Sequence, residues 1–188
     1  MRELDDWALV ERAQSGNSDA FALIVRRYQG PVVHFCYRMV GSRQDAEDIA
    51  QEAFLRVYRY LGRLRPEARF STFLFGIARN LALNHLRDAR RRGRDRAQPL
   101  DARPDVESRY GRPAHDAEAS ETGARIAAAL AQLSPEHRMA VHLREIEGLD
   151  YADIARIMRC RPGTVKSRLA RARDQLRRLI LEQESDAP

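Results

Sequence analysis

One stretch, residues 150–178, constrains the fold of this chain more than any other. Its sequence, DYADIARIMRCRPGTVKSRLARARDQLRR, contains two helix-forming segments separated by a short break. Pro162 and Gly163 follow the break, and proline is favoured in the first turn of a helix because its missing N–H has no partner there. In the second segment, apolar residues recur at i, i+4, i+7 and i+11 along one helical face: Val165, Leu169, Ala172 and Leu176. Two helices joined by a tight turn are therefore predicted.

The second of these helices is polar and basic away from its apolar stripe. Its early polar residues are Thr164, Ser167, Arg168 and Arg171. This layout is typical of a helix-turn-helix, which offers the early residues of its second helix to the DNA major groove. Residues 159–178 carry a net charge of +7, which leaves −1 for the rest of a chain whose total is +6. A second basic run covers residues 90–96, so two separate contacts with a polyanion are indicated.

A predicted helix that begins at Asp45 has the opposite charge. Its apolar residues form one helical stripe: Ala46, Ile49, Ala50, Ala53, Val57 and Leu61. Asp45 is the expected N-cap, and acidic residues suit the positive end of the helix dipole. The outer face carries Glu47, Asp48 and Glu52, with Gln51 between them. Two interpretations are open: an ordinary acidic helix start, or a docking surface for a basic partner protein.

The next predicted helix spans residues 72–90, with Ser71 as its cap, and carries two stripes. The stripe expected to face a core contains Leu74, Ile77, Ala78 and Leu81. The second stripe contains Phe73, Gly76, Asn80, Asn84 and Arg87. Such a stripe suits unpaired nucleotides, because a ring can stack on a base, amides can form hydrogen bonds with base edges, and arginines can bind phosphate. The other interpretation places Phe73 in the core and leaves the asparagines merely exposed.

The remaining periodic segments of the first half are also predicted to be helical. A first helix, capped by Asp5 or Asp6, is expected to end near Gly16, and a second starts at Asn17 or Ser18. Gly30-Pro31 is expected to break or kink this second helix. The spacing of the apolar residues that follow favours a helix that continues to Gly41.

The C-terminal part repeats this pattern. A helix is expected over residues 126–133, and Ser134-Pro135-Glu136 marks a helix start, with Ser134 as the cap. Gly148 is expected to end that helix, and Asp150 to cap the helix-turn-helix. No segment alternates between apolar and polar residues over the length of a strand, so the predicted fold class is all-α.

Residues 93–123 divide the chain into two predicted helical domains, residues 1–92 and 124–188. This segment holds three of the eight prolines, and its only large aliphatic residues are Leu100 and Val106; from Pro99 on it carries six acidic residues. It is too poor in apolar groups to build a core, so we expect a flexible linker.

Several classes of site are not expected. Cys36 and Cys160 are isolated and lack metal-ligand spacing, and we expect Cys36 to be a core residue, so neither a disulfide nor a metal site is predicted. No cofactor is predicted, and the five histidines are scattered. The N-terminus has no apolar region of a signal peptide, and no run is long enough to span a membrane, so a cytoplasmic protein is expected.

Two blocks of this sequence resemble the bacterial RNA polymerase sigma factors of the extracytoplasmic-function group. The first block, DAEDIAQEAFLRVYRYL followed by FSTFLFGIARNLALNHLR, looks like sigma region two. The second, LSPEHRMAVHLREIEGLDYADIARIMRCRPGTVKSRLARAR, looks like region four. The resemblance implies that the first domain binds polymerase core and melts the −10 promoter element, whereas the second reads the −35 element.

The resemblance also implies roles for individual residues. Those expected to contact polymerase core are Asp45, Glu47, Asp48, Gln51, Glu52 and Leu55. Residues 64–70 resemble the loop that captures a flipped −10 base. The residues expected to contact −10 DNA are Arg65, Phe73, Arg79, Asn80, Asn84 and Arg87. Those expected to contact −35 DNA are Thr164, Lys166, Ser167, Arg168, Arg171 and Arg173.

The sequence departs from the family pattern at three places. Phe73 stands where tryptophan is usual, and Arg161-Pro162 adds positive charge at the start of the second helix of the helix-turn-helix. Arg159 stands where glycine is common in the turn, so either this residue is strained or the turn differs.

A transcription initiation factor is the leading interpretation, with polymerase core, promoter DNA and a separate anti-sigma factor as expected partners. A stand-alone helix-turn-helix regulator is the alternative, but it explains neither the acidic face of the helix that begins at Asp45 nor the polar stripe that contains Asn80. An enzyme is not expected, because the sequence contains no phosphate-binding loop, paired metal ligands or nucleophile–base motif.

Overall fold

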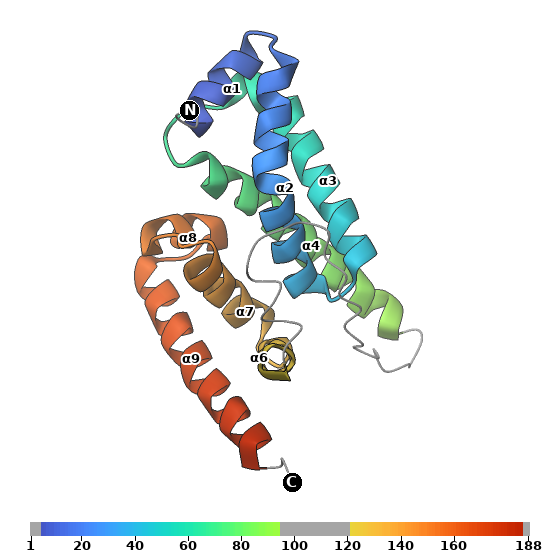
Figure 1. Cartoon of the computed structure of the whole chain (residues 1–188), viewed down its shortest axis with the longest axis vertical. Coiled ribbons are helices and arrows are strands. Elements are labelled where there is room, and N and C mark those ends of the chain that lie inside the picture. The colour runs from blue at the N-terminus through green and yellow to red at the C-terminus, as the bar shows by residue number, and fades with distance from the viewer. Residues whose placement is uncertain (1–4, 95–120, 186–188) are drawn as a thin grey trace. The chain divides into compact units, whose positions relative to one another are not determined.

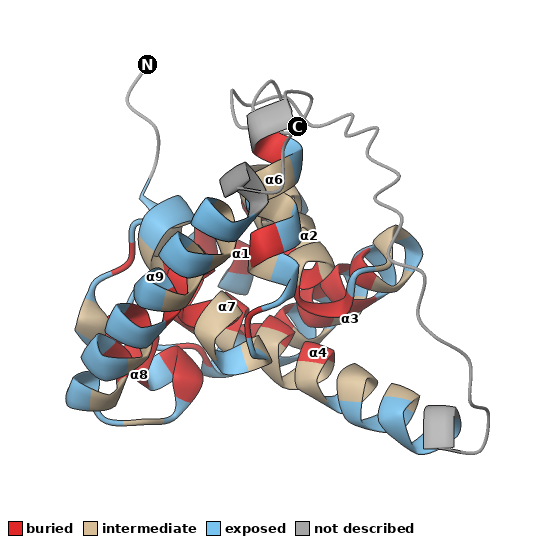
Figure 2. Cartoon of the chain, turned by 90° about the horizontal axis from the view of Figure 1, so that it is seen from below, coloured by how far each residue is buried: buried red, intermediate tan, exposed pale blue. Residues whose placement is uncertain are grey.

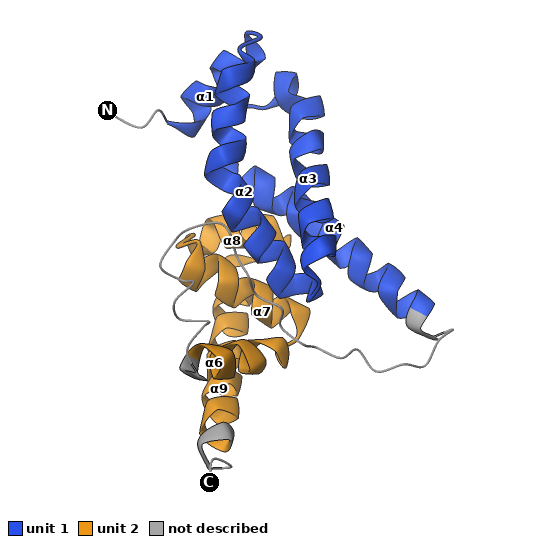
Figure 3. Cartoon of the chain, turned by 45° about the vertical axis from the view of Figure 1, so that its right-hand side comes forward, with its two compact units in different colours: residues 1–100 blue, residues 101–188 orange. Residues whose placement is uncertain are grey.

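The computed structural model describes residues 5–94 and 121–185, and within these ranges it contains helices and no strand, as predicted (Figure 1). The chain divides into two compact units, residues 1–100 and residues 101–188 (Figure 3). Most of the predicted linker, residues 95–120, lies outside the described part of the chain.

The first unit is built from four α-helices and one short 3₁₀ turn in the described ranges: α1 (Asp6–Gln14), α2 (Ser18–Val40), α3 (Arg43–Tyr60), η1 (Leu61–Arg63) and α4 (Phe70–Arg94). Helices α2 and α3 run side by side, and both pack on α4, while α1 packs on α2 (Figure 1). The rings of Phe35 and Phe75 meet edge to face in this core, with their centroids 5.4 Å apart. The buried stripes of these helices therefore point at one another (Figure 2).

Helix α2 passes through Pro31 without ending, so of the two outcomes expected at Gly30-Pro31, a break or a kink, the break does not occur. Proline inside a helix removes one backbone hydrogen bond and costs about 3 kcal/mol. Burial of Ile24 before the proline, and of Val32 and Phe35 after it, offsets this cost because each side chain is fully excluded from solvent. The prediction of a helix over residues 32–40 is confirmed.

Among the predicted caps of the first unit, Asn17 is confirmed, whereas Asp45 and Ser71 are wrong. Asn17 accepts a hydrogen bond from the Ala20 N–H at 3.0 Å, as expected of an N-cap. Asp45 does not cap α3, because Gly41 ends α2 with a φ of 79° and the chain turns at once. Ser42 is the cap instead and accepts from the Asp45 N–H at 3.3 Å. Gly41 therefore ends one helix directly before the next begins.

Ser71 is the second residue of α4 rather than its cap, because α4 begins at Phe70. The Phe70 ring is buried against the rings of Trp7 and Tyr28, at centroid distances of 6.4 and 5.5 Å. This anchoring draws the start of the helix into the core. On the predicted core stripe, Leu74 and Ala78 are fully buried, whereas Ile77 and Leu81 are half-buried.

The second unit contains α6 (Glu121–Ala131), α7 (Pro135–Val141), a π-helical turn η2 (His142–Ile146), α8 (Tyr151–Met158) and α9 (Pro162–Ser185). Helix α6 begins earlier than the predicted residue 126. Ser134 caps α7 by accepting from the His137 N–H at 3.3 Å, as expected. Both α6 and α7 pack on α9, around a core that includes Met139, Leu143 and Leu169.

Helices α8 and α9 form the predicted helix-turn-helix. Asp150 caps α8 by accepting from the Asp153 N–H at 2.8 Å. Arg159 ends α8 in the left-handed conformation, with φ 53° and ψ 49°. The N–H groups of Arg159 and Cys160 donate to the carbonyls of Arg156 and Ala155, at 3.2 and 3.0 Å. These two bonds define a Schellman motif, in which glycine is the favoured left-handed residue. Of the two expectations for Arg159, the strained conformation is the one that is found.

Within the described ranges, no helix is both long enough and apolar enough to cross a membrane.

Replacement of Arg159 by glycine is expected to stabilise the second unit by about 0.5–1 kcal/mol. Relief of the left-handed strain, about 1–2 kcal/mol, exceeds the added entropy of the unfolded chain, about 0.5–1 kcal/mol. Calorimetry of the whole chain measures the unfolding of both units. The fluorescence of Trp7, the single tryptophan, identifies which transition belongs to the first unit, so the other transition reports the second. Arg161→Gly is the matched control and should not stabilise, because Arg159 is the only non-glycine residue of the described part with a positive φ.

Candidate functional site

Helix α3 presents a narrow polar stripe to solvent. Asp48, Gln51 and Leu55 are all exposed and follow one another at i, i+3 and i+7, so they lie on one face. Leu55 is 45% exposed and adds an apolar side chain to this stripe. An apolar residue among polar ones on an open face is typical of a protein-binding surface.

The acidic charge of this stripe is partly neutralised by arginines of the same helix. Arg43 Nε lies 2.9 Å from Glu47 Oε1, and Arg56 Nε lies 2.7 Å from Glu52 Oε1. The hydrogen bond from Arg56 lowers the pKa of the Glu52 carboxyl. Asp48, by contrast, has no ion-pair partner in the described part of the chain. The i,i+4 spacing of both pairs was readable from the sequence.

Asp45 lies one turn before Asp48, at the end of the stripe where α3 meets α4. It is half-buried, and its Oδ2 lies 3.5 Å from Nε2 of His85 on α4. All six residues predicted to contact polymerase core therefore lie on α3, and Asp45 among them also contacts α4.

The polar stripe of α4 is accessible along its length. Phe73, Gly76 and Asn80 are half-buried, and Asn84 and Arg87 are exposed, so Phe73 is not part of the closed core. A side chain added at Gly76 would meet no atom within 4 Å, apart from its own helix backbone and chain neighbours. The stripe is thus a shallow surface with a ring at one end and charge at the other.

Two arginines orient the asparagine amides of this stripe. Arg79 Nη1 donates to Asn80 Oδ1 at 3.0 Å, and Arg87 Nη2 donates to Asn84 Oδ1 at 2.7 Å. Because a guanidinium only donates, the atom it meets is the amide oxygen. The NH₂ group of each asparagine is therefore the part left to donate to an acceptor on a base.

The loop between η1 and α4 holds its own arginine. Arg65 Nη1 donates to the carbonyls of Leu64 at 2.8 Å and Gly62 at 3.3 Å. Arg65 is exposed, yet its guanidinium folds back on the loop backbone. In this arrangement Arg65, which was predicted to contact −10 DNA, stabilises the backbone of its own loop.

Helix α9 presents its predicted DNA-binding residues outward. On the predicted apolar stripe, Val165, Leu169 and Ala172 are fully buried, whereas Leu176 is half-buried. Of the predicted −35 contacts on the open face, Lys166, Ser167, Arg171 and Arg173 are exposed, whereas Thr164 and Arg168 are half-buried. Ser167 Oγ donates to the Thr164 carbonyl at 3.0 Å. This face therefore offers exposed cations and polar groups from the early turns of the helix.

Two arginines of α9 have partners that the sequence did not reveal. Arg173 Nη2 lies 2.6 Å from Glu145 Oε1 on η2, and this hydrogen bond raises the pKa of Arg173. Arg168 Nη1 lies 3.8 Å from Cys160 Sγ in the turn. Arg171 has neither kind of contact in the described ranges, so its guanidinium is the most available of the three.

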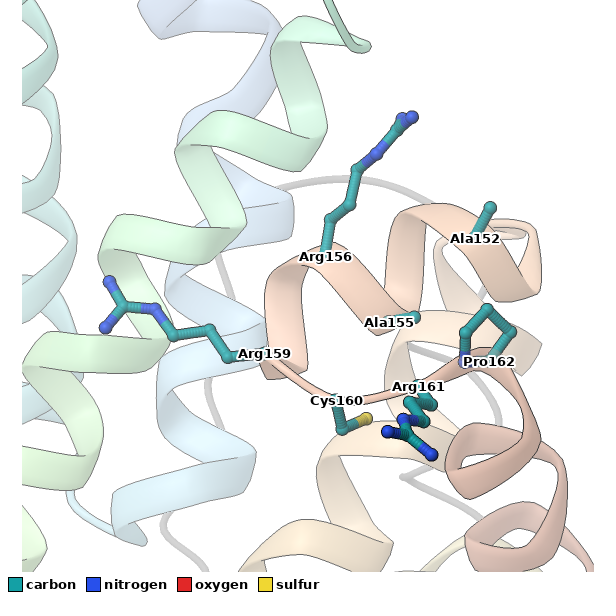
Figure 4. A pocket seen from close by; sticks show the side chains of 7 residues that line it. All are labelled: Ala152, Ala155, Arg156, Arg159, Cys160, Arg161 and Pro162. Carbon is teal, nitrogen blue, oxygen red and sulfur yellow. The ribbon is translucent and has the colours of Figure 1, made fainter.

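An open hollow of about 580 Å³ lies where α8 meets the start of α9 (Figure 4). Its lining residues are Ala152, Ala155, Arg156, Arg159, Cys160, Arg161 and Pro162. Figure 4 shows that the three arginines point in different directions, and Arg156 Nη1 lies 3.3 Å from Asp153 Oδ1. The arginines form a basic rim rather than a closed anion site. The described residues contain no group of His, Cys, Asp or Glu that could hold a metal ion.

Both units match known protein families. Residues 24–92 match the family model of Sigma-70 region 2, and residues 123–176 match that of Sigma-70, region 4. The chain is 40% identical to the RNA polymerase sigma-H factor of Pseudomonas aeruginosa. This match extends over 180 residues and covers 91% of each protein. It is 38% identical to the ECF RNA polymerase sigma-E factor of Escherichia coli. This match also extends over 180 residues and covers 93% of each protein.

The fold is also similar to that of solved structures. The sigma factor RpoE of Bartonella quintana, in complex with the anti-sigma factor NepR, has a TM-score of 0.72 at 24% identity over 85% of this chain and 96% of that one. CnrH, in complex with the cytosolic domain of CnrY, has a TM-score of 0.69 at 23% identity over 97% of this chain and 99% of that one.

The sequence relatives span nearly the whole chain and include both units, which a stand-alone helix-turn-helix regulator does not explain. The chain therefore belongs to the extracytoplasmic-function group of bacterial RNA polymerase sigma factors, in the sigma-70 family, and is a transcription initiation factor rather than an enzyme.

Proposed function

We propose that this protein guides RNA polymerase core to promoters through three separate surfaces. The observation that carries the proposal is the presence in one chain of an exposed acidic stripe on α3, an oriented asparagine stripe on α4 and an arginine-rich face on α9. One surface suits a basic protein, one suits unpaired bases and one suits duplex DNA. Residues 1–92 then hold polymerase and the −10 element, residues 124–188 read the −35 element, and residues 93–123 join them.

The stripe on α3 is assigned to polymerase core. Asp48 supplies its least compensated charge, and Leu55 supplies apolar area that binding would remove from water. Glu47 and Glu52 contribute less attraction, because each already has an arginine partner. Gln51 lies between the acids and can donate or accept. Asp45 contributes indirectly in this proposal, by tying α3 to α4 through His85.

The stripe on α4 and the preceding loop are assigned to the −10 element. Removing a base from the duplex costs a few kcal/mol, which stacking and hydrogen bonding must offset. Phe73 offers a ring for stacking, while the amides of Asn80 and Asn84 offer donors whose direction Arg79 and Arg87 fix. Arg65 acts here by shaping the loop.

The outer face of α9 is assigned to the −35 element. Arg171 and Arg168 are placed near bases or backbone, Lys166 and Arg173 near phosphates, and Thr164 and Ser167 beside them at the start of the helix. The basic rim of Arg159 and Arg161 adds attraction for the backbone where α9 begins.

A separate anti-sigma factor is proposed as the regulator. The RpoE and CnrH structures of similar fold were each solved with a second protein, named an anti-sigma factor for RpoE. An inhibitor of this chain would cover the α3 and α9 surfaces, so that neither polymerase nor DNA could bind. We place this control in the cytoplasm, where polymerase and promoter DNA are found.

Run-off transcription tests the whole proposal. The protein, polymerase core and a pool of genomic promoter fragments should give discrete transcripts that core alone does not give. Tight binding to duplex DNA by the free chain, without any core-dependent transcript, would support the stand-alone regulator and reject the proposal.

Charge reversal at Asp48 is expected to weaken binding to polymerase core at least about tenfold, mainly through a slower association rate. Asp48→Arg is the cleaner variant, because Glu52→Arg would also place a like charge beside Arg56. Association is measured by surface-immobilised core at two salt concentrations. Glu11→Arg, an exposed acid on α1, is the matched control and should bind as the wild type does. Unchanged affinity of Asp48→Arg would remove α3 from the interface.

Arg171→Ala is expected to cost about 1–3 kcal/mol in binding of the preferred −35 duplex if its guanidinium reads a base. The measurement is holoenzyme affinity for duplexes that differ at single −35 positions. Arg177→Ala, farther along α9 and exposed, is the control and should change affinity little. An equal loss on every sequence would make Arg171 a phosphate contact.

A further inference from the structure

Helix α1 lies outside the segment that matches region 2, which begins at residue 24, yet it is bonded to the loop before α4. It is fixed to α2 by its own contacts. Asp6 accepts hydrogen bonds from Arg27 Nη1 and from the Tyr28 hydroxyl, each at 2.5 Å. These contacts give α1 a defined position from which to act on the loop.

Gln14, the last residue of α1, holds the start of the loop. Its Nε2 donates to the Leu61 carbonyl at 2.8 Å and to the Leu64 carbonyl at 3.2 Å. Both carbonyls belong to the turn where the chain leaves α3. One amide thereby adds a second donor to each carbonyl, because Leu61 also accepts from the Leu64 N–H and Leu64 also accepts from Arg65 Nη1.

Trp7 holds the other end of the loop. Its indole Nε1 donates to the Ala68 carbonyl at 3.0 Å, and its ring meets the ring of Phe70 edge to face. Phe70 is the first residue of α4 and is buried. The end of the loop is therefore fixed by a polar and an apolar contact from the same side chain.

Between these two anchors, the residues Arg65, Pro66 and Glu67 are exposed. Leu64 is buried at one side and Ala68 is half-buried at the other. The anchors leave only a short exposed tip, whose backbone direction is set by contacts on both flanks. Such a loop can present its tip to a ligand without first ordering itself, which preserves affinity.

We propose that Gln14 and Trp7 are positioning residues that hold this loop in the shape required to receive an unpaired promoter base. The inference rests on the proposed −10 function of the loop and adds α1 to the machinery of strand capture. Neither side chain needs to touch DNA. Loss of either anchor lowers the fraction of protein whose loop is competent, and the apparent affinity falls by the same factor.

The test uses full-length protein assembled with polymerase core. The probe is a pool of single-stranded DNA with a randomised −10 segment. Gln14→Glu keeps the shape but removes the donor, whereas Gln14→Lys keeps a donor of similar reach. Trp7→Phe keeps an aromatic ring against Phe70 and removes the N–H. Gln132→Glu, exposed in the second unit, matches the charge change of Gln14→Glu away from the loop.

Gln14→Glu and Trp7→Phe are each expected to weaken binding of the enriched strand about three- to tenfold and to flatten base preference at one position. Gln14→Lys should restore most of the affinity, and Gln132→Glu should behave as the wild type. Thermal unfolding, affinity for core and affinity for the −35 duplex are measured in parallel and should remain near their wild-type values.

Each outcome decides a different question. If Gln14→Glu and Trp7→Phe both bind the enriched strand with wild-type affinity and base preference, the inference is overturned and the proposed function still stands. A loss that follows the fall in melting temperature, with no rescue by Gln14→Lys, would also overturn it, because α1 would then serve only stability. If the wild-type holoenzyme enriches no strand at all, the proposed −10 function fails first, and the inference fails with it.

Discussion

Burial of one apolar stripe on each long helix fixes the direction of the polar side chains on which recognition depends. On α9, Val165, Leu169 and Ala172 are excluded from solvent, so Lys166 and Arg171 have to point outward. The same geometry on α3 sets Asp48 and Leu55 opposite the buried Ala46 and Ala53. Because each stripe is packed against its own unit, the outward faces are rigid platforms rather than loops. Most of the polar groups assigned to binding therefore stand on helices that are already ordered.

The excess surface charge differs in sign between α3 of the first unit and α9 of the second. On α3, arginines one turn away neutralise Glu47 and Glu52, which leaves Asp48 as the local excess of negative charge. On α9, the excess is positive, and only part of it is offset, by Asp174 beside Arg177 and by Glu145 beside Arg173. Internal pairing of this kind keeps an isolated charged face from repelling itself. It also concentrates the attraction for a partner on a few unpaired groups.

Features encoded by neighbouring residues could be read from the sequence, whereas long-range ones could not. The helix-turn-helix, the caps at Asn17, Ser134 and Asp150 and the strained Arg159 all follow from local spacing. The cap at Ser42 was missed because Asp45, three residues on, is an equally good capping residue by type. The contacts of Gln14 and Trp7 with the loop, and of Arg173 with Glu145, join residues distant in sequence. Sequence periodicity cannot predict such pairs, because they depend on how the helices pack against one another.

The two cysteines sit in opposite environments, and this gives the molecule a chemical asymmetry. Cys36 is fully buried in α2, and burial raises its pKa to about 12, so its thiolate is essentially absent at neutral pH. Cys160 lies half-exposed in the turn that leads into α9. A thiol-directed fluorophore would therefore mark the helix-turn-helix selectively in the native protein. The single tryptophan, Trp7, lies in the other unit at the edge of the loop. The sequence thus provides an intrinsic fluorophore in the first unit and a labelling site in the second, so changes in the two units can be followed separately and in real time.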